Sequence, residues 1–129
     1  MDEPSEAIRL FIQAYVDSID FLRVLLVMAR SPERDWTEAE VASATALALD
    51  ICRLQLEKVS ARGLASRTDS PEGKYRYGPR ADELRRLVQE LIALDDHYPV
   101  TLIKLVYGRP TTPSQAAQAF SDAFRLRRP

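Results

Sequence analysis

The chain has 129 residues, of which 46% are hydrophobic and 29% are charged, and its formal net charge is −1 at pH 7. This length and composition indicate one globular domain with a modest core and argue against two full domains. The small net charge excludes an overall electrostatic attraction to nucleic acid or anionic lipid, so either partner would have to meet a local charged patch.

The charge is distributed unevenly along the chain. Residues 1–50 carry ten acidic and four basic side chains, residues 51–86 carry five acidic and nine basic ones, and residues 87–129 carry four acidic and five basic ones. The net charges of the three regions are therefore −6, +4 and +1. We expect any anion-binding patch in the middle region.

Three features indicate a soluble cytoplasmic protein. The single cysteine, Cys52, cannot form an internal disulfide, which agrees with a reducing compartment. The N-terminal sequence MDEPSEAIRL lacks the basic flank and the apolar run of a signal peptide. The longest apolar run, Val24–Ala29, is far shorter than the roughly 20 residues of a membrane span, so no membrane association is expected.

An apolar stripe with steps of three and four residues predicts helix from Ser5 to about Arg30. The pattern fits either one long helix or two helices that break near Asp17-Ser18, since either residue can cap a second helix. Ser31-Pro32 ends the helical stretch, because a residue before proline avoids the α region. The stripe consists of Ile8, Phe11, Ile12, Tyr15, Ile19, Leu22, Leu26 and Ala29.

The segment from Thr37 to Glu40 has the sequence of a capping box, which predicts a short helix over about Glu38–Ala44. Trp36 precedes the cap, and we expect it to anchor this helix by packing. Thr45–Ala48 is predicted to be a tight link.

A third helix is predicted over about Leu49–Ala61, with Cys52, Leu56 and Val59 on one face. Gly63 follows this helix at the position where a residue with positive φ commonly ends a helix. Leu64–Arg67 and Lys74–Tyr77 then read as two short strands, joined by the polar loop of residues 68–73.

Two further helices and a tail helix complete the prediction. Arg80–Asp95 has a strong amphipathic pattern that ends before Tyr98-Pro99. Val100–Tyr107 is apolar on nearly all sides, which indicates burial within the domain or between two subunits. Residues 111–129 have apolar side chains at helical spacing, Phe120 and Phe124 among them, and a basic end.

This order of elements resembles the bacterial winged helix-turn-helix regulators of the MarR and ArsR type. The resemblance rests on WTEAEVASATALALDICRLQLEKVSARGLASR and KYRYGP and covers about residues 20–108. It implies a mainly α fold with a small β-hairpin, that is, a winged helix-turn-helix with additional N- and C-terminal helices. We expect residues 1–110 to form this domain and residues 111–129 to form the tail helix.

The resemblance also implies a DNA-binding transcriptional regulator. We expect it to act as a homodimer, because the N-terminal stripe, Val100–Tyr107 and the tail are surplus apolar segments that need burial. Its third helix would enter the major groove and its hairpin wing would contact phosphates, where basic side chains release counterions. Base contacts would fall to Leu49, Asp50, Arg53, Leu54 and Glu57. Phosphate contacts would fall to Lys58, Arg62, Arg67, Lys74 and Arg76.

A winged-helix module that binds a protein instead of DNA is the alternative. On the third helix, Leu49 and Leu54 suit apolar contacts, while Asp50 and Glu57 repel phosphates. Leu49 and Leu54, together with Phe120 and Phe124 of the tail, are the candidate contacts for a protein partner. A third possibility is an effector pocket between the N-terminal stripe and the Arg80–Asp95 helix, for which the sequence names no ligand.

The sequence predicts neither an enzyme nor a cofactor or metal site. No Gly-rich phosphate loop, HExxH motif or CxxC motif occurs, and the single histidine and cysteine are far apart in sequence. Asp95, Asp96 and His97 form a cluster that we interpret as a solvated helix end. We interpret Cys52 as a small buried hydrophobic residue and not as a redox sensor.

Overall fold

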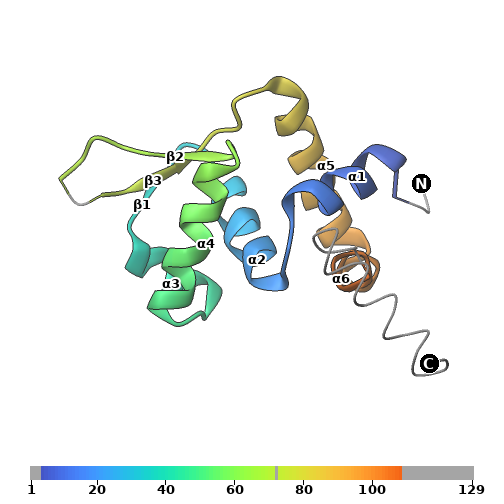
Figure 1. The fold of residues 1–129 in the computed structure, drawn as a ribbon, viewed down its shortest axis with the longest axis horizontal. Coiled ribbons are helices and arrows are strands. Elements are labelled where there is room, and N and C mark those ends of the chain that lie inside the picture. The colour runs from blue at the N-terminus through green and yellow to red at the C-terminus, as the bar shows by residue number, and fades with distance from the viewer. Residues whose placement is uncertain (1–3, 72, 109–129) are drawn as a thin grey trace, which may run out of the picture.

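The computed structural model describes residues 4–71 and 73–108 (Figure 1). This part of the chain is mainly helical, with six helices and one three-stranded antiparallel sheet. The predicted class of a mainly α protein with a small β-hairpin is confirmed at this level. None of the helices in the described ranges is long and apolar enough to cross a membrane. The elements are α1 (Glu6–Tyr15), α2 (Ile19–Ala29), β1 (Asp35–Trp36), α3 (Glu38–Thr45), α4 (Leu49–Ala61), β2 (Ala65–Arg67), β3 (Tyr75–Tyr77), α5 (Asp82–His97) and α6 (Pro99–Tyr107).

The N-terminal apolar stripe forms two helices, the second of the two arrangements that the sequence allows. Val16 leaves α1 in an extended conformation, and Ser18 caps α2 because its hydroxyl accepts a hydrogen bond of 3.0 Å from the backbone N–H of Phe21. The corner at Asp17 turns the stripe: α1 packs against α5 and α6, whereas α2 packs against α3 and α4 as well as α5 and α6.

The predictions for α3 and α4 are confirmed almost to the residue. Thr37 and Glu40 form the reciprocal capping box, and α3 ends at Thr45, one residue later than expected. Ala46 has a φ of 60°, which tightens the link to α4. α4 has the predicted bounds, and Gly63 follows it with a φ of 79°.

The sheet contains a strand that the sequence did not predict. β1 pairs with β3, which also pairs with β2, so the strand order is β1-β3-β2 and both pairings are antiparallel. Trp36 lies opposite Tyr75, and both side chains are buried. Trp36 is thus buried, as we expected of a packing residue, and it is also part of a two-residue strand too short to show alternation.

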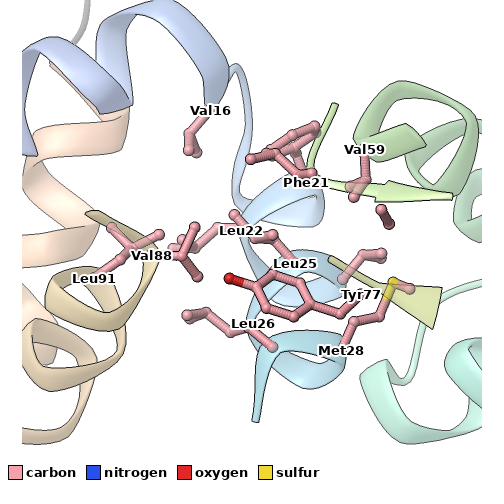
Figure 2. Packing of buried hydrophobic residues seen from close by; sticks show 14 of the residues in the cluster. Val16, Phe21, Leu22, Leu25, Leu26, Met28, Val59, Tyr77, Val88 and Leu91 are labelled. Atoms are coloured by element: carbon pink, nitrogen blue, oxygen red, sulfur yellow. The ribbon is translucent and has the colours of Figure 1, made fainter. Parts of the chain in front are cut away.

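The core is organised around α2, which has buried side chains on most of its circumference. It lies between α3 and α4 on one side and α5 and α6 on the other (Figure 1). Figure 2 shows Tyr77 of β3 pointing toward Leu22 and Leu25 of this helix. Burial raises the pKa of Tyr77 to about 12, so this phenol stays neutral in the core.

The two later helices differ from prediction in bounds and in burial. α5 begins and ends two residues later than expected, at Asp82 and His97. In α6, Leu102 and Val106 are buried but Val100, Ile103 and Tyr107 are exposed, so the described chain covers only one face of this helix. Burial of the other face between subunits stays a prediction. The predicted tail helix, with Phe120 and Phe124, lies outside the described residues.

The left-handed turn after α4 gives a first testable prediction. Gly63→Ala should lower the free energy of unfolding by about 1–3 kcal/mol, because a residue with a Cβ is strained at a φ of 79°. The added Cβ also meets the Arg80 side chain, whose exposed end can move. Urea unfolding measures the effect. Gly78→Ala is the control, since a Cβ there meets nothing within 4 Å, and equal losses in the two variants would contradict the account.

Candidate interaction surface on α4 and the hairpin

The outward face of α4 mixes large apolar side chains with carboxylates. Leu49 is 45% exposed and Leu54 is 49% exposed, while the opposite face of the helix packs into the core. Asp50 and Glu57 flank Leu54 at helical spacing and are exposed. Ile51 is also exposed at 40%, a residue that the sequence analysis did not single out. The surface therefore offers apolar area with negative charge around it.

Arg53 is the cation on this part of α4, and it is paired. Its Nε donates a hydrogen bond of 3.0 Å to Oε1 of Glu38, the first residue of α3. This hydrogen bond and the charge of Glu38, with smaller contributions from Glu57 and Asp50, raise the pKa of Arg53. The predicted base-reading cation thus lies among three carboxylates.

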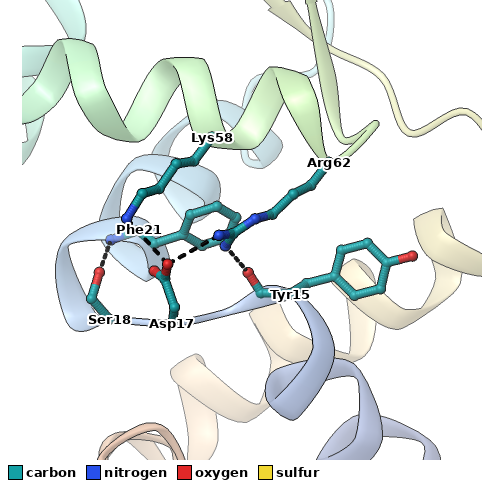
Figure 3. A network of polar contacts seen from close by, with 6 residues as sticks. All are labelled: Tyr15, Asp17, Ser18, Phe21, Lys58 and Arg62. Carbon is teal, nitrogen blue, oxygen red and sulfur yellow. Dashed lines mark hydrogen bonds and ion pairs between the residues drawn. The ribbon is translucent and has the colours of Figure 1, made fainter. Parts of the chain in front are cut away.

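Lys58 and Arg62 hold α4 to the corner between α1 and α2 (Figure 3). Lys58 Nζ lies 3.1 Å and Arg62 Nη2 lies 3.0 Å from the same oxygen, Oδ2 of Asp17. Arg62 Nη1 also donates a hydrogen bond of 2.6 Å to the backbone carbonyl of Tyr15. The guanidinium lies over the Phe21 ring at 4.9 Å. These two predicted phosphate contacts therefore have a structural role in the fold.

The hairpin places its two arginines on opposite faces of the sheet. Arg67 lies opposite Tyr75, and Arg76 lies opposite Ser66, so Arg67 and Arg76 point to different sides of the pleat. Arg67 stacks over the Tyr75 ring at 5.5 Å. Arg76 Nε lies 2.6 Å from Oδ1 of Asp35 in β1.

Lys74 precedes β3 at the end of the hairpin loop. Its backbone carbonyl accepts a hydrogen bond of 2.7 Å from the backbone N–H of Thr68, which holds the two arms together next to the loop. The hydrogen bond from the Thr37 backbone is the largest cause of the lowered pKa of Glu40, and the charge of Lys74 contributes to it. Lys74 thus lies within electrostatic reach of α3.

Cys52 is buried, and the two carboxylates at the end of α5 pair with Arg30. Cys52 is buried in α4, and burial, aided by the charge of Glu38, raises the pKa of its thiol to about 11. Asp95 and Asp96 lie 2.8 Å and 2.9 Å from the same guanidinium nitrogen of Arg30. Among the residues that the structure describes, no group of three or more His, Cys, Asp or Glu side chains could hold a metal ion.

The Asp17 contact generates a prediction about stability and pH. Burial of the carboxyl acts to raise its pKa, but hydrogen bonds from Arg62 and Lys58 outweigh burial and hold the pKa below 3.8. Asp17→Asn should therefore lower the free energy of unfolding by about 1–3 kcal/mol at pH 7. The stabilisation is complete above the unfolded-state pKa, and it is lost as the pH falls through the lower folded-state pKa.

Urea unfolding from pH 7 down to pH 3 tests this prediction, with Asp35→Asn as the control. Asp35 pairs with Arg76 at the surface, where such pairs contribute only about 0–1 kcal/mol. We expect the gap between the wild type and Asp17→Asn to exceed that of the control and to shrink at acidic pH. A gap that does not change with pH would show that the ion pairs do not cause it.

Burial of Cys52 predicts a slow reaction with thiol reagents. A pKa of about 11 against an ordinary 9.0 reduces the thiolate fraction at pH 8 by two powers of ten, and burial blocks access as well. Alkylation by iodoacetamide should thus be at least about 100-fold slower in the folded protein than in urea. Mass spectrometry measures the two alkylation rates. Similar rates in the folded and the unfolded protein would identify a reactive thiol.

Comparison with models of protein families, with curated proteins and with solved structures finds no match to this chain. The geometry, exposure and charge of α4 and the hairpin therefore carry the functional argument.

Proposed function

We propose that residues 19–77 form a winged helix-turn-helix that binds a protein partner through the outward face of α4. The order α2-β1-α3-α4-β2-β3 supports the fold, as does the sheet order β1-β3-β2, with a hairpin directly after α4. In this arrangement α4 takes the place of the recognition helix and the β2–β3 hairpin takes the place of the wing.

The observation that carries the function is the internal pairing of the basic residues. Arg53 pairs with Glu38, Lys58 and Arg62 pair with Asp17, and Arg76 pairs with Asp35. Each of these carboxylates comes from the acidic first 50 residues, and each cation comes from the basic region 51–86. The charge asymmetry of the sequence is thus partly neutralised by ion pairs within the chain, of which Arg53–Glu38 and Arg76–Asp35 lie at the surface.

The chemistry of the α4 face defines the kind of partner. Leu49, Ile51 and Leu54 expose apolar area that another protein can cover, and hot spots of protein interfaces are built from such desolvated contacts. Asp50 and Glu57 beside Leu54 favour a partner segment that carries Lys or Arg next to an apolar side chain. These two carboxylates repel the phosphates of a DNA backbone.

DNA binding by a homodimer is the second candidate, and the hairpin favours it. Three basic residues lie within one short hairpin, namely Arg67, Lys74 and Arg76. An exposed ion pair such as Arg76–Asp35 contributes little free energy, so Arg76 can exchange Asp35 for a phosphate at little cost. Binding of this kind would be largely independent of sequence, because phosphate contacts position a protein without reading bases.

Site-specific photo-crosslinking in cells tests the proposed partner surface. A photoreactive amino acid in place of Leu54 should give a covalent protein adduct, whereas the same amino acid in place of Leu10 should not. Leu10 is a matched control because it is 54% exposed on α1, on a different element. Adducts to DNA from position 54, or equal protein adducts from both positions, would contradict the proposal.

The partner captured in this way allows a quantitative test. Leu54→Glu should weaken its binding at least about tenfold, since losing a central apolar contact costs about 2 kcal/mol or more. Leu10→Glu should leave the affinity unchanged, and both exposed substitutions should keep the free energy of unfolding within about 0.5 kcal/mol. Isothermal titration calorimetry measures the affinities. Equal losses in the two variants would show that α4 does not form the interface.

A further inference from the structure

A groove lies along α2, and residues of α3, α5 and α6 complete its lining. Its volume is about 370 Å³, within the range of about 300–1,000 Å³ that is common for small-molecule sites. The α4 surface proposed to bind a partner takes no part in this groove. The groove is therefore a second, separate site.

The surface between the ends of the groove is apolar. Leu22 and Leu26 lie one helical turn apart on α2 and are almost fully buried, so they form a floor. Ile103 of α6 also lines the groove and is 42% exposed. This surface favours a ligand with apolar side chains, because covering it removes apolar area from water.

Charged side chains stand at two places along the groove. Arg23 is exposed on α2, and its side chain has no ion pair among the residues that the structure describes. At Arg30, the single nitrogen Nη2 lies 2.8 Å from Oδ2 of Asp95 and 2.9 Å from Oδ1 of Asp96. The groove is therefore neutral overall but polarised, with a positive charge at Arg23 and a surplus negative charge around Arg30.

We propose that the groove binds a short apolar peptide of about three residues with both termini free. Its C-terminal carboxylate pairs with Arg23, and its N-terminal ammonium pairs with Asp95 and Asp96. Arg23 and Arg30 are seven residues apart on α2, which is a rise of about 10.5 Å. An extended tripeptide spans about 10–11 Å, so its two termini reach both charged places at once.

Other small ligands match only part of this pattern. A fatty acid anion places a carboxylate at Arg23 but leaves the surplus negative charge of Asp95 and Asp96 without a complement. A free amino acid carries both charges, but it is too short to reach both places. In an extended peptide, alternate side chains point the same way, so two of three apolar side chains can face the floor.

NMR titration of the full chain with trileucine tests the proposal. Amide signals of Leu26, Val27 and Ile103, which line the groove, should shift on binding. N-acetyl-trileucine amide has neither charge and should bind at least about tenfold more weakly, because two partly exposed ion pairs are lost. Shifts confined to α4, or equal affinities for the two peptides, would overturn the proposal.

Arg23→Gln isolates the carboxylate contact. It should weaken the binding of trileucine about threefold to fivefold and leave that of trileucine amide unchanged, because the amide has no carboxylate for Arg23 to bind. Arg86→Gln is the control and should change neither affinity, since Arg86 is exposed on α5 and lies outside the groove. Equal losses for the two peptides in Arg23→Gln would contradict the assigned direction of binding.

The ammonium contact is tested in the same way. Asp95→Asn combined with Asp96→Asn should weaken the binding of trileucine and spare N-acetyl-trileucine, which has no ammonium group. Thermal unfolding of each variant confirms that a lost affinity is not caused by a lost fold. Absence of trileucine binding to the wild type at millimolar concentration would overturn the proposal for the groove and leave the α4 surface untouched, because the two sites share no residue.

Discussion

Burial of α2 on most of its circumference is the constraint on which the other elements depend. Its side chains meet α3 and α4 on one side, α5 and α6 on another, and Tyr77 of the sheet. The corner at Asp17 sets where this helix begins, and the same carboxylate binds Lys58 and Arg62 of α4. The orientation of α4 relative to the core is thereby determined by both apolar packing and a partly buried ion pair, and the outward face of α4 follows from it.

The packing of α4 against α2 explains why the chain has an acidic first region and a basic middle region. In sequence, the basic region from residue 51 to residue 86 suggests a patch for an anion. In the fold, its cations meet Asp17, Asp35 and Glu38 from the acidic first region, across sequence separations of 15 to 45 residues. What remains outward on α4 is mostly apolar and acidic, with its cation Arg53 paired to Glu38, and this suits a basic, apolar segment of a protein better than a phosphate backbone.

Local signals in the sequence were sufficient for most of the fold, and the failures involve long-range contacts. The Thr37–Glu40 capping box and Gly63 determine their own backbone geometry, so α3, α4 and the turn after α4 were predicted closely. β1 was missed because two residues become a strand only by pairing with β3. The exposure of Leu49 and Leu54 follows from helical periodicity, whereas the pairing of Lys58 and Arg62 with Asp17 depends on the packing of α2 and could not be read from spacing.

The central claim is that the outward face of α4 is directed at a protein and not at DNA. Its most direct test is the binding of random-sequence duplex DNA, measured by fluorescence anisotropy at 20 mM and at 150 mM salt. Protein carrying Arg67→Ala and Arg76→Ala is measured alongside. The account predicts negligible binding at micromolar protein even at low salt, and little difference between the two proteins. Tight binding that falls steeply with salt and is lost in the double variant would contradict the account. Such behaviour is expected when basic side chains bind phosphates and displace their counterions.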